Sequence, residues 1–167
     1  LVENRLHASL PLTVEVVFAT MNDMRILLTG GAGYLGSVLT PLLLRLGYRV
    51  TVIDNLSHGG EPLLGLFQDE NFRFVKGDII DRNAVEALLW EEKIDTIVHF
   101  AAESHVDRSI SGPAAFIDTN IVGTHNLLQA ARSVWLDSDD APTSHRFHHV
   151  STDEVYGSLE PGEYFTE

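Results

Sequence analysis

The chain has 167 residues, a length that suits one domain with a sizeable hydrophobic core. Its formal net charge of −13 disfavours nucleic acid or an anionic membrane surface as a partner, because both carry negative charge themselves. The absence of cysteine excludes disulfide bonds and thiol chemistry and is consistent with a cytoplasmic location, and no apolar run is long enough to cross a membrane.

Residues 1–23 stand apart from the pattern that follows. Met21 or Met24 would be a natural start for the domain, and the preceding segment lacks the charged start and apolar core of a signal peptide. We therefore expect an N-terminal extension, consisting of upstream or added sequence. The alternative is an extra strand at residues 12–20, where β-prone side chains gather.

From Met24 onward, strand and helix patterns alternate along the chain. This alternation predicts an α/β fold, a doubly wound parallel sheet with helices on both faces. Asp81 is expected to cap a helix, and Pro113 to lie in the first turn of another. The predicted strands are 25–29, 49–53, 72–76, 95–100 and 146–151, and the predicted helices are 33–46, 81–92 and 113–133, with a short helix at 62–67.

The first predicted strand runs into a glycine turn. Gly31, Gly33 and Gly36 fit G-x-G-x-x-G, and Gly30 extends the pattern. Such glycines permit a tight turn, let the backbone approach a pyrophosphate, and allow close packing of helix on strand. The second strand ends in Asp54, about twenty residues later, where a carboxylate would hold the ribose hydroxyls of adenosine. Together these features predict a Rossmann fold that binds NAD, and the carboxylate disfavours NADP.

Polar residues follow the later strands, at the edge where ligands bind in open α/β sheets. Asp78 could hold an adenine amine, and the small Ala101 and Ala102 would let a cofactor lie close. Asp153 and Glu154 could divide the roles of acid and base, provided that the strand ends first, because neighbours within a strand point to opposite faces. A solvated acidic turn is the alternative for this pair. The histidines of the last strand are not expected to form a metal site.

Three stretches resemble the dTDP-glucose 4,6-dehydratases, which are NAD-dependent members of the extended short-chain dehydrogenase/reductase group. They are GGAGYLGS, HFAAESHVDRSISGPAAFIDTNIVGT and HHVSTDEVYGSL. The likeness covers residues 24–167, although residues 54–59 (DNLSHG) look more like the nucleotide-sugar epimerases and decarboxylases. The Tyr-x-x-x-Lys motif of the family is absent, so we expect an NAD-binding domain that is incomplete at its C-terminus and inactive by itself.

The resemblance also implies roles for individual residues. Asp153 would protonate the departing C6 hydroxyl of a nucleotide-diphospho-sugar, Glu154 would remove the C5 proton, and Thr152 would assist, with Ser104 and Thr152 near the sugar. Hydride would pass from C4 to NAD and return to C6. The residues implied to bind NAD are Gly30, Gly33, Tyr34, Leu35, Gly36, Asp54, Asn55, Leu56, Ser57, Asp78, Ile79, Phe100, Ala101, Ala102, Glu103, Ser104 and Thr119.

Two alternatives stay open for the function. One is a UDP-sugar 4-epimerase or decarboxylase, which the Asp153–Glu154 pair disfavours because neither enzyme needs it for an elimination. The other is a non-catalytic nucleotide-binding module. For the assembly we expect a homo-oligomer, because family members dimerise through the helix at 113–133 and the strand at 146–151 would lack a sixth strand beside it. The later helix with which this helix pairs in the family is also missing, so Phe116, Leu127 and Leu128 would be partly uncovered. Residues 1–23, folded back as a strand, could instead cover that edge.

Overall fold

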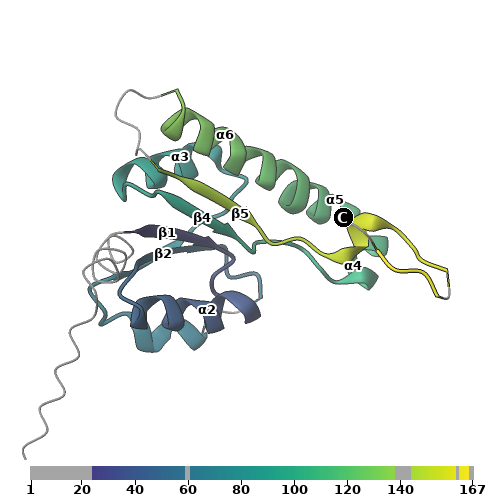
Figure 1. Cartoon of the computed structure of the whole chain (residues 1–167), viewed down its shortest axis with the longest axis horizontal. Coiled ribbons are helices and arrows are strands. Elements are labelled where there is room, and N and C mark those ends of the chain that lie inside the picture. Colours follow the sequence, from purple (N-terminus) through teal and green to yellow (C-terminus); the bar gives the residue numbers. More distant parts are fainter. Residues whose placement is uncertain (1–23, 59–60, 138–143, 161, 166–167) are drawn as a thin grey trace, which may run out of the picture.

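The computed structural model describes residues 24–58, 61–137, 144–160 and 162–165. Five strands form one parallel sheet in the order β3-β2-β1-β4-β5, which is the order of the first five strands of a Rossmann sheet (Figure 1). The predicted fold class is therefore confirmed. The proposed extension at 1–23, with its strand at 12–20, lies outside the described residues. The strands are β1 (Arg25–Thr29), β2 (Arg49–Asp54), β3 (Phe72–Lys76), β4 (Thr96–His99) and β5 (Arg146–His149).

Helices cover both faces of this sheet. On one face, α3 (Arg82–Glu91) and α6 (Thr124–Trp135) pack against Leu27 of β1; on the other, α2 (Tyr34–Arg45) and the 3₁₀ helix η1 (Glu61–Leu66) enclose Ile26 and Leu28 (Figure 1). Neighbouring side chains of β1 thus enter different cores, and all three are buried. Burial on both faces explains why the strand reads as an apolar run rather than as an alternating pattern.

The local signals that set the helix starts are confirmed. The Asp81 carboxylate accepts a hydrogen bond from the Ala84 amide at 3.1 Å and so caps α3. Pro113 is the first residue of α5 (Pro113–Phe116), where its missing N–H costs nothing. Among the helices in the described part of the chain, none combines the length and apolarity needed to cross a bilayer.

The helix predicted at 113–133 is present, but it is not α-helical throughout. It runs without a gap through α5, the π-helix η2 (Ile117–Gly123) and α6. The short helix α4 (Val106–Ser111) precedes them, in a stretch too polar and too short to stand out in the sequence. Leu127 is fully buried in the core, contrary to the expectation, whereas Phe116 is half-buried and Leu128 is exposed.

The chain turns soon after the last strand. β5 ends at His149, two residues before the end of the predicted strand, and the 3₁₀ helix η3 (Asp153–Tyr156) follows. Within the described residues, β5 pairs only with β4, so its other edge has no strand beside it. The segment that carries the predicted acid–base pair therefore leaves the sheet at an open edge.

Candidate functional site

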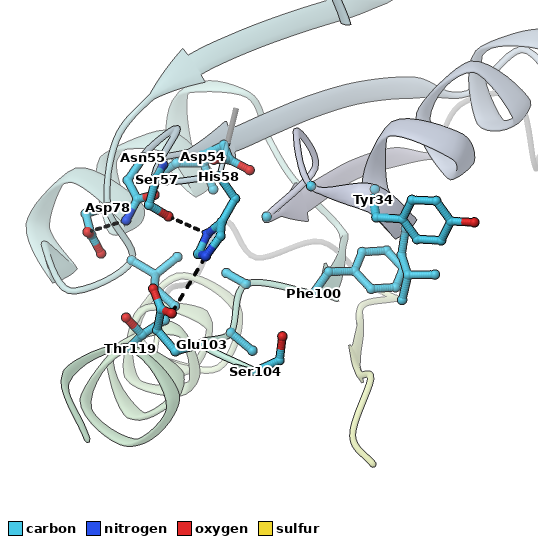
Figure 2. Close-up of a pocket in the computed structure, with 18 of the residues that line it drawn as sticks. Tyr34, Asp54, Asn55, Ser57, His58, Asp78, Phe100, Glu103, Ser104 and Thr119 are labelled. Atoms are coloured by element: carbon cyan, nitrogen blue, oxygen red, sulfur yellow. Dashed lines mark hydrogen bonds and ion pairs between the residues drawn. The ribbon is translucent and has the colours of Figure 1, made fainter. Parts of the chain in front are cut away.

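A cleft of about 330 Å³ lies at the carboxyl ends of the first four strands (Figure 2). This is the edge of an open α/β sheet where ligands bind. The cleft is lined from the turn between β1 and α2, from the loops after β2, β3 and β4, and from η2. Its lining residues are Gly30, Gly33, Tyr34, Leu35, Gly36, Ile53, Asp54, Asn55, Ser57, His58, Gly77, Asp78, Ile79, Phe100, Ala101, Ala102, Glu103, Ser104, His105 and Thr119.

The glycine turn is closed by backbone contacts that leave no room for side chains. Gly30 has a φ of +69°, and a Cβ added there would lie 2.7 Å from the backbone of Ala101. A Cβ on Gly36 would lie 2.4 Å from the Cα of Gly31. The first residues of α2 line the cleft, and the amides of a first helical turn have no acceptor within the helix. Such an end favours an anion, so the turn fits the pyrophosphate of a dinucleotide.

Asp54 ties the glycine turn to the loop after β2. Its Oδ2 accepts a hydrogen bond from the Ala32 amide at 2.9 Å, and its Oδ1 accepts one from the Leu56 amide at 2.8 Å. Asp54 itself lines the cleft, but Leu56 does not, because its side chain packs into the core beneath α2. The structure therefore does not place the Leu56 side chain in the cleft, and the NAD contact that the resemblance implies for Leu56 stays a prediction. The carboxylate combines a structural task with its predicted position beside a ribose.

Asn55 and Asp78 form a second polar group at the same end of the cleft. The Asn55 side-chain amide donates to Asp78 Oδ2 at 3.0 Å (Figure 2). Asp78 Oδ1 accepts from the Ile80 amide at 3.0 Å. Both residues line the cleft. The two partners hold the Asp78 carboxylate in one orientation, with lone pairs left to accept from a ligand amine.

A buried histidine lies at the carboxyl end of β4, just before the loop that lines the cleft. His99 is 1% exposed at the end of β4; its Nδ1 lies 2.6 Å from Thr29 Oγ1, and its Nε2 lies 2.9 Å from Thr124 Oγ1. Burial, and to a lesser degree the neighbouring His149, lower the pKa of His99 to about 4. The ring is therefore neutral at pH 7 and joins the ends of β1 and β4 to the start of α6. The Ala101 amide also reaches Thr29 Oγ1, at 3.4 Å.

The residues predicted to act on the substrate differ in their position relative to this cleft. Ser104 lines it, but Thr152 and Asp153 do not; both are exposed in the segment after β5. The backbone of Glu154 lies in η3 beside Asp153. The structure thus brings together the residues predicted for the cofactor, with the exception of Leu56, and the catalytic roles of the other three stay predictions. Among the described residues, no group of three or more His, Asp or Glu side chains could hold a metal ion.

Sequence reasoning missed four residues of the cleft. Ile53, Gly77, His58 and His105 line it, and each adjoins a residue that was predicted. Their position beside strand-end motifs was the available signal. For His58, the sequence could not show which side chain it would meet, because the partner lies far along the chain.

Comparisons with known proteins agree with this geometry. The sequence model of the GDP-mannose 4,6 dehydratase family matches residues 27–167. The dTDP-glucose 4,6-dehydratase 1 of Escherichia coli (strain K12) is 50% identical over 141 residues, which are 81% of this chain and 39% of that protein. The chain thus spans about two fifths of the length of such curated relatives.

Solved structures show the same relationship. DesIV, a dTDP-glucose 4,6-dehydratase from Streptomyces venezuelae with NAD and TYD bound, matches 84% of this chain and 43% of its own, with a TM-score of 0.72 and 44% identity. The Thermus thermophilus UDP-glucose 4-epimerase complex with NAD matches 66% of this chain and 34% of its own, with a TM-score of 0.59 and 35% identity. The family match, the order of the strands and the glycine turn in the cleft all indicate the same family. The chain belongs to the GDP-mannose 4,6 dehydratase family.

Proposed function

We propose that this chain is the NAD-binding part of a dTDP-glucose 4,6-dehydratase, a lyase that converts a nucleotide-diphospho-sugar into its 4-keto-6-deoxy form. The observation that carries the proposal is the cleft, which unites the glycine turn, Asp54 and Asp78 on one surface. The dehydratase relatives, at 50% identity for the Escherichia coli protein, support the assignment of the reaction.

The residues of the cleft fit NAD in three places. The start of α2 would hold the pyrophosphate, since Tyr34 and Leu35 line the cleft and the amides of a first helical turn have no acceptor within the helix. Asp54 would accept from the adenosine ribose hydroxyls with the lone pairs left after its two backbone contacts. Ala101 and Ala102 would lie against the cofactor, with Ser104 and Thr119 beside it.

The bound cofactor would supply a reversible hydride acceptor for the sugar. The chain would supply proton transfer from the segment after β5. Asp153 would donate a proton to the departing C6 hydroxyl, and Glu154 would remove the proton from C5, which a ketone at C4 makes acidic. Thr152 and Ser104 would orient the sugar. Loss of water then needs one acid and one base, which is what this adjacent pair offers.

A UDP-sugar 4-epimerase or decarboxylase is the second candidate. Its support is the likeness of residues 54–59 and the structural match to the Thermus thermophilus epimerase. An epimerase leaves the mass of its substrate unchanged, whereas a dehydratase product is lighter by one water. Mass spectrometry of products formed by the protein that carries this chain therefore separates the two. A non-catalytic nucleotide-binding module would give neither product.

We further propose a cytoplasmic homo-oligomer with a role in deoxysugar biosynthesis. The open edge of β5 and the exposed Val106, Ile110, Ile117 and Ile121 support self-association, because water-exposed apolar side chains and unpaired strand edges favour contact with another copy. The lack of cysteine is consistent with the cytoplasm.

Calorimetry with NAD and NADP tests the cofactor assignment directly. The folded 167-residue chain should bind NAD, and it should bind NADP at least about tenfold more weakly, because Asp54 would face the 2′-phosphate. Circular dichroism establishes that the sample is folded. A folded chain without affinity for NAD would refute the proposal.

A further inference from the structure

Two side chains, those of Glu103 and Arg108, meet the imidazole of His58 across the cleft. His58 lies in the loop after β2, Glu103 in the segment between β4 and α4, and Arg108 in α4. His58 Nε2 lies 3.8 Å from Glu103 Oε2 and 3.4 Å from Arg108 Nη1. Figure 2 shows His58 reaching across the cleft to Glu103. No motif assigns this contact, which we call the His58 clasp.

The clasp can form with either charge state of the ring. When Nε2 carries no proton, it can accept a hydrogen bond from the Arg108 guanidinium. When Nε2 is protonated and the ring is charged, it is attracted to the Glu103 carboxylate. Both partners belong to the same wall, so one contact across the cleft is available in each state.

Both sides of the clasp are held by further hydrogen bonds. On the near side, Ser57 Oγ lies 2.9 Å from His58 Nδ1. On the far side, the Asn120 side chain bonds the backbone of Glu103 twice, accepting from its amide at 2.8 Å and donating to its carbonyl at 2.9 Å. The contact therefore joins a ring that its neighbour Ser57 orients to a Glu103 backbone that Asn120 anchors, which lowers the entropy cost of forming it.

We propose that the His58 clasp closes the cleft around its bound dinucleotide and slows its release. The inference rests on the proposed NAD function. His58 and Glu103 both line the cleft, from opposite sides, so a ligand held there is enclosed while they stay together. The pair is partly open, with side-chain exposures of 40% and 16%, which limits its strength. A weak contact at the mouth of a site affects the dissociation rate more than the association rate.

The first test compares NAD dissociation rates in stopped-flow experiments. His58→Phe keeps a ring of similar size but removes both nitrogens, and it should raise the dissociation rate about two- to fivefold, the range for one partly exposed ion pair. His125→Phe is the matched control, because His125 is exposed on α6 and does not line the cleft; it should leave the rate unchanged. If the chain binds NAD and His58→Phe releases it at the wild-type rate, the clasp is overturned while the proposed function stands.

The second test needs no cofactor and uses the absence of native cysteine. The double variant His58→Cys/Arg108→Cys should be joined within one chain by a short bis-methanethiosulfonate reagent, and neither single variant should be. Joining the walls after NAD has bound should slow its release several-fold, and dithiothreitol should restore the faster rate. Failure of the two positions to crosslink in the folded chain would overturn the clasp, whether or not NAD binds.

Discussion

Replacement of Asp54 tests two roles of its carboxylate: the backbone contacts that the structure shows and the ribose contact that we propose. From the sequence alone, Asp54→Ala would weaken NAD binding and leave the fold intact. The structure changes the second half of that prediction, because Asp54 also accepts from the Ala32 and Leu56 amides at 2.9 and 2.8 Å. Its removal frees the glycine turn from the loop after β2, so stability and affinity should both fall.

The magnitudes follow from these contacts. A hydrogen bond to a charged group contributes about 1.5–3 kcal/mol. Two such bonds are lost in Asp54→Ala, but the site is half open and water can replace part of them, so the free energy of unfolding should fall by about 2–3 kcal/mol. Asp54→Asn keeps one acceptor oxygen and the side-chain volume, and it should cost about 1 kcal/mol. Either variant removes the charged contact to the ribose, so NAD affinity should fall tenfold or more.

Urea denaturation and NAD calorimetry on the same samples measure the two effects. The reasoning about the ribose fails if Asp54→Asn binds NAD as the wild type does. The reasoning about the turn fails if Asp54→Ala unfolds at the wild-type urea concentration. If Asp54→Ala keeps the wild-type stability but binds NAD more weakly, Asp54 acts only at the ribose, as its sequence position indicates.

Three further predictions concern packing, protonation and assembly. Gly36→Ala should destabilise the chain by about 1–3 kcal/mol in urea denaturation, because its Cβ would lie 2.4 Å from the Gly31 Cα. The pKa of His99 falls from 6.5 to about 4 on folding, so the unfolded chain binds the proton at a higher pH than the folded chain does. The free energy of unfolding should therefore decline by about 3 kcal/mol as pH falls from about 6.5 to about 4. His99→Gln should flatten that decline in a pH series of denaturation curves. Sedimentation at low micromolar concentration should show a dimer or larger species, and a stable monomer whose β5 amides exchange rapidly would count against the open-edge argument.

The sheet was predictable because its signals are local. Apolar runs such as residues 26–28 mark strands buried on both faces, and the glycine spacing with Asp54 determines which edge holds the cleft. Single-residue signals such as Asp81 and Pro113 mark helix starts through their own chemistry. These features do not depend on distant parts of the chain.

The features that escaped prediction depend on distant partners. The His58 clasp joins residues 45 and 50 positions apart, and no local pattern marks either partner. The π-helix η2 lies within a sequence that reads as one continuous α-helix. Its Asn120 bonds to Glu103, 17 residues away, and no local pattern marks that partner. The buried position of Leu127 depends on how α6 is rotated against α3, which periodicity alone did not fix.

The π-helix has a geometric consequence for the whole α5–α6 segment. Each residue of an α-helix advances the side-chain direction by about 100°, so one extra residue per turn changes which face the upstream part presents. α6 must direct Leu127 and Ala130 into the core, while Thr119 must line the cleft and Asn120 must reach Glu103. The widened turn between them lets each requirement be met with its own rotation. Deleting one residue from η2 would remove the widened turn and fix the rotation of Thr119 and Asn120 relative to α6. Either the core side chains or the cleft side chains would then point the wrong way.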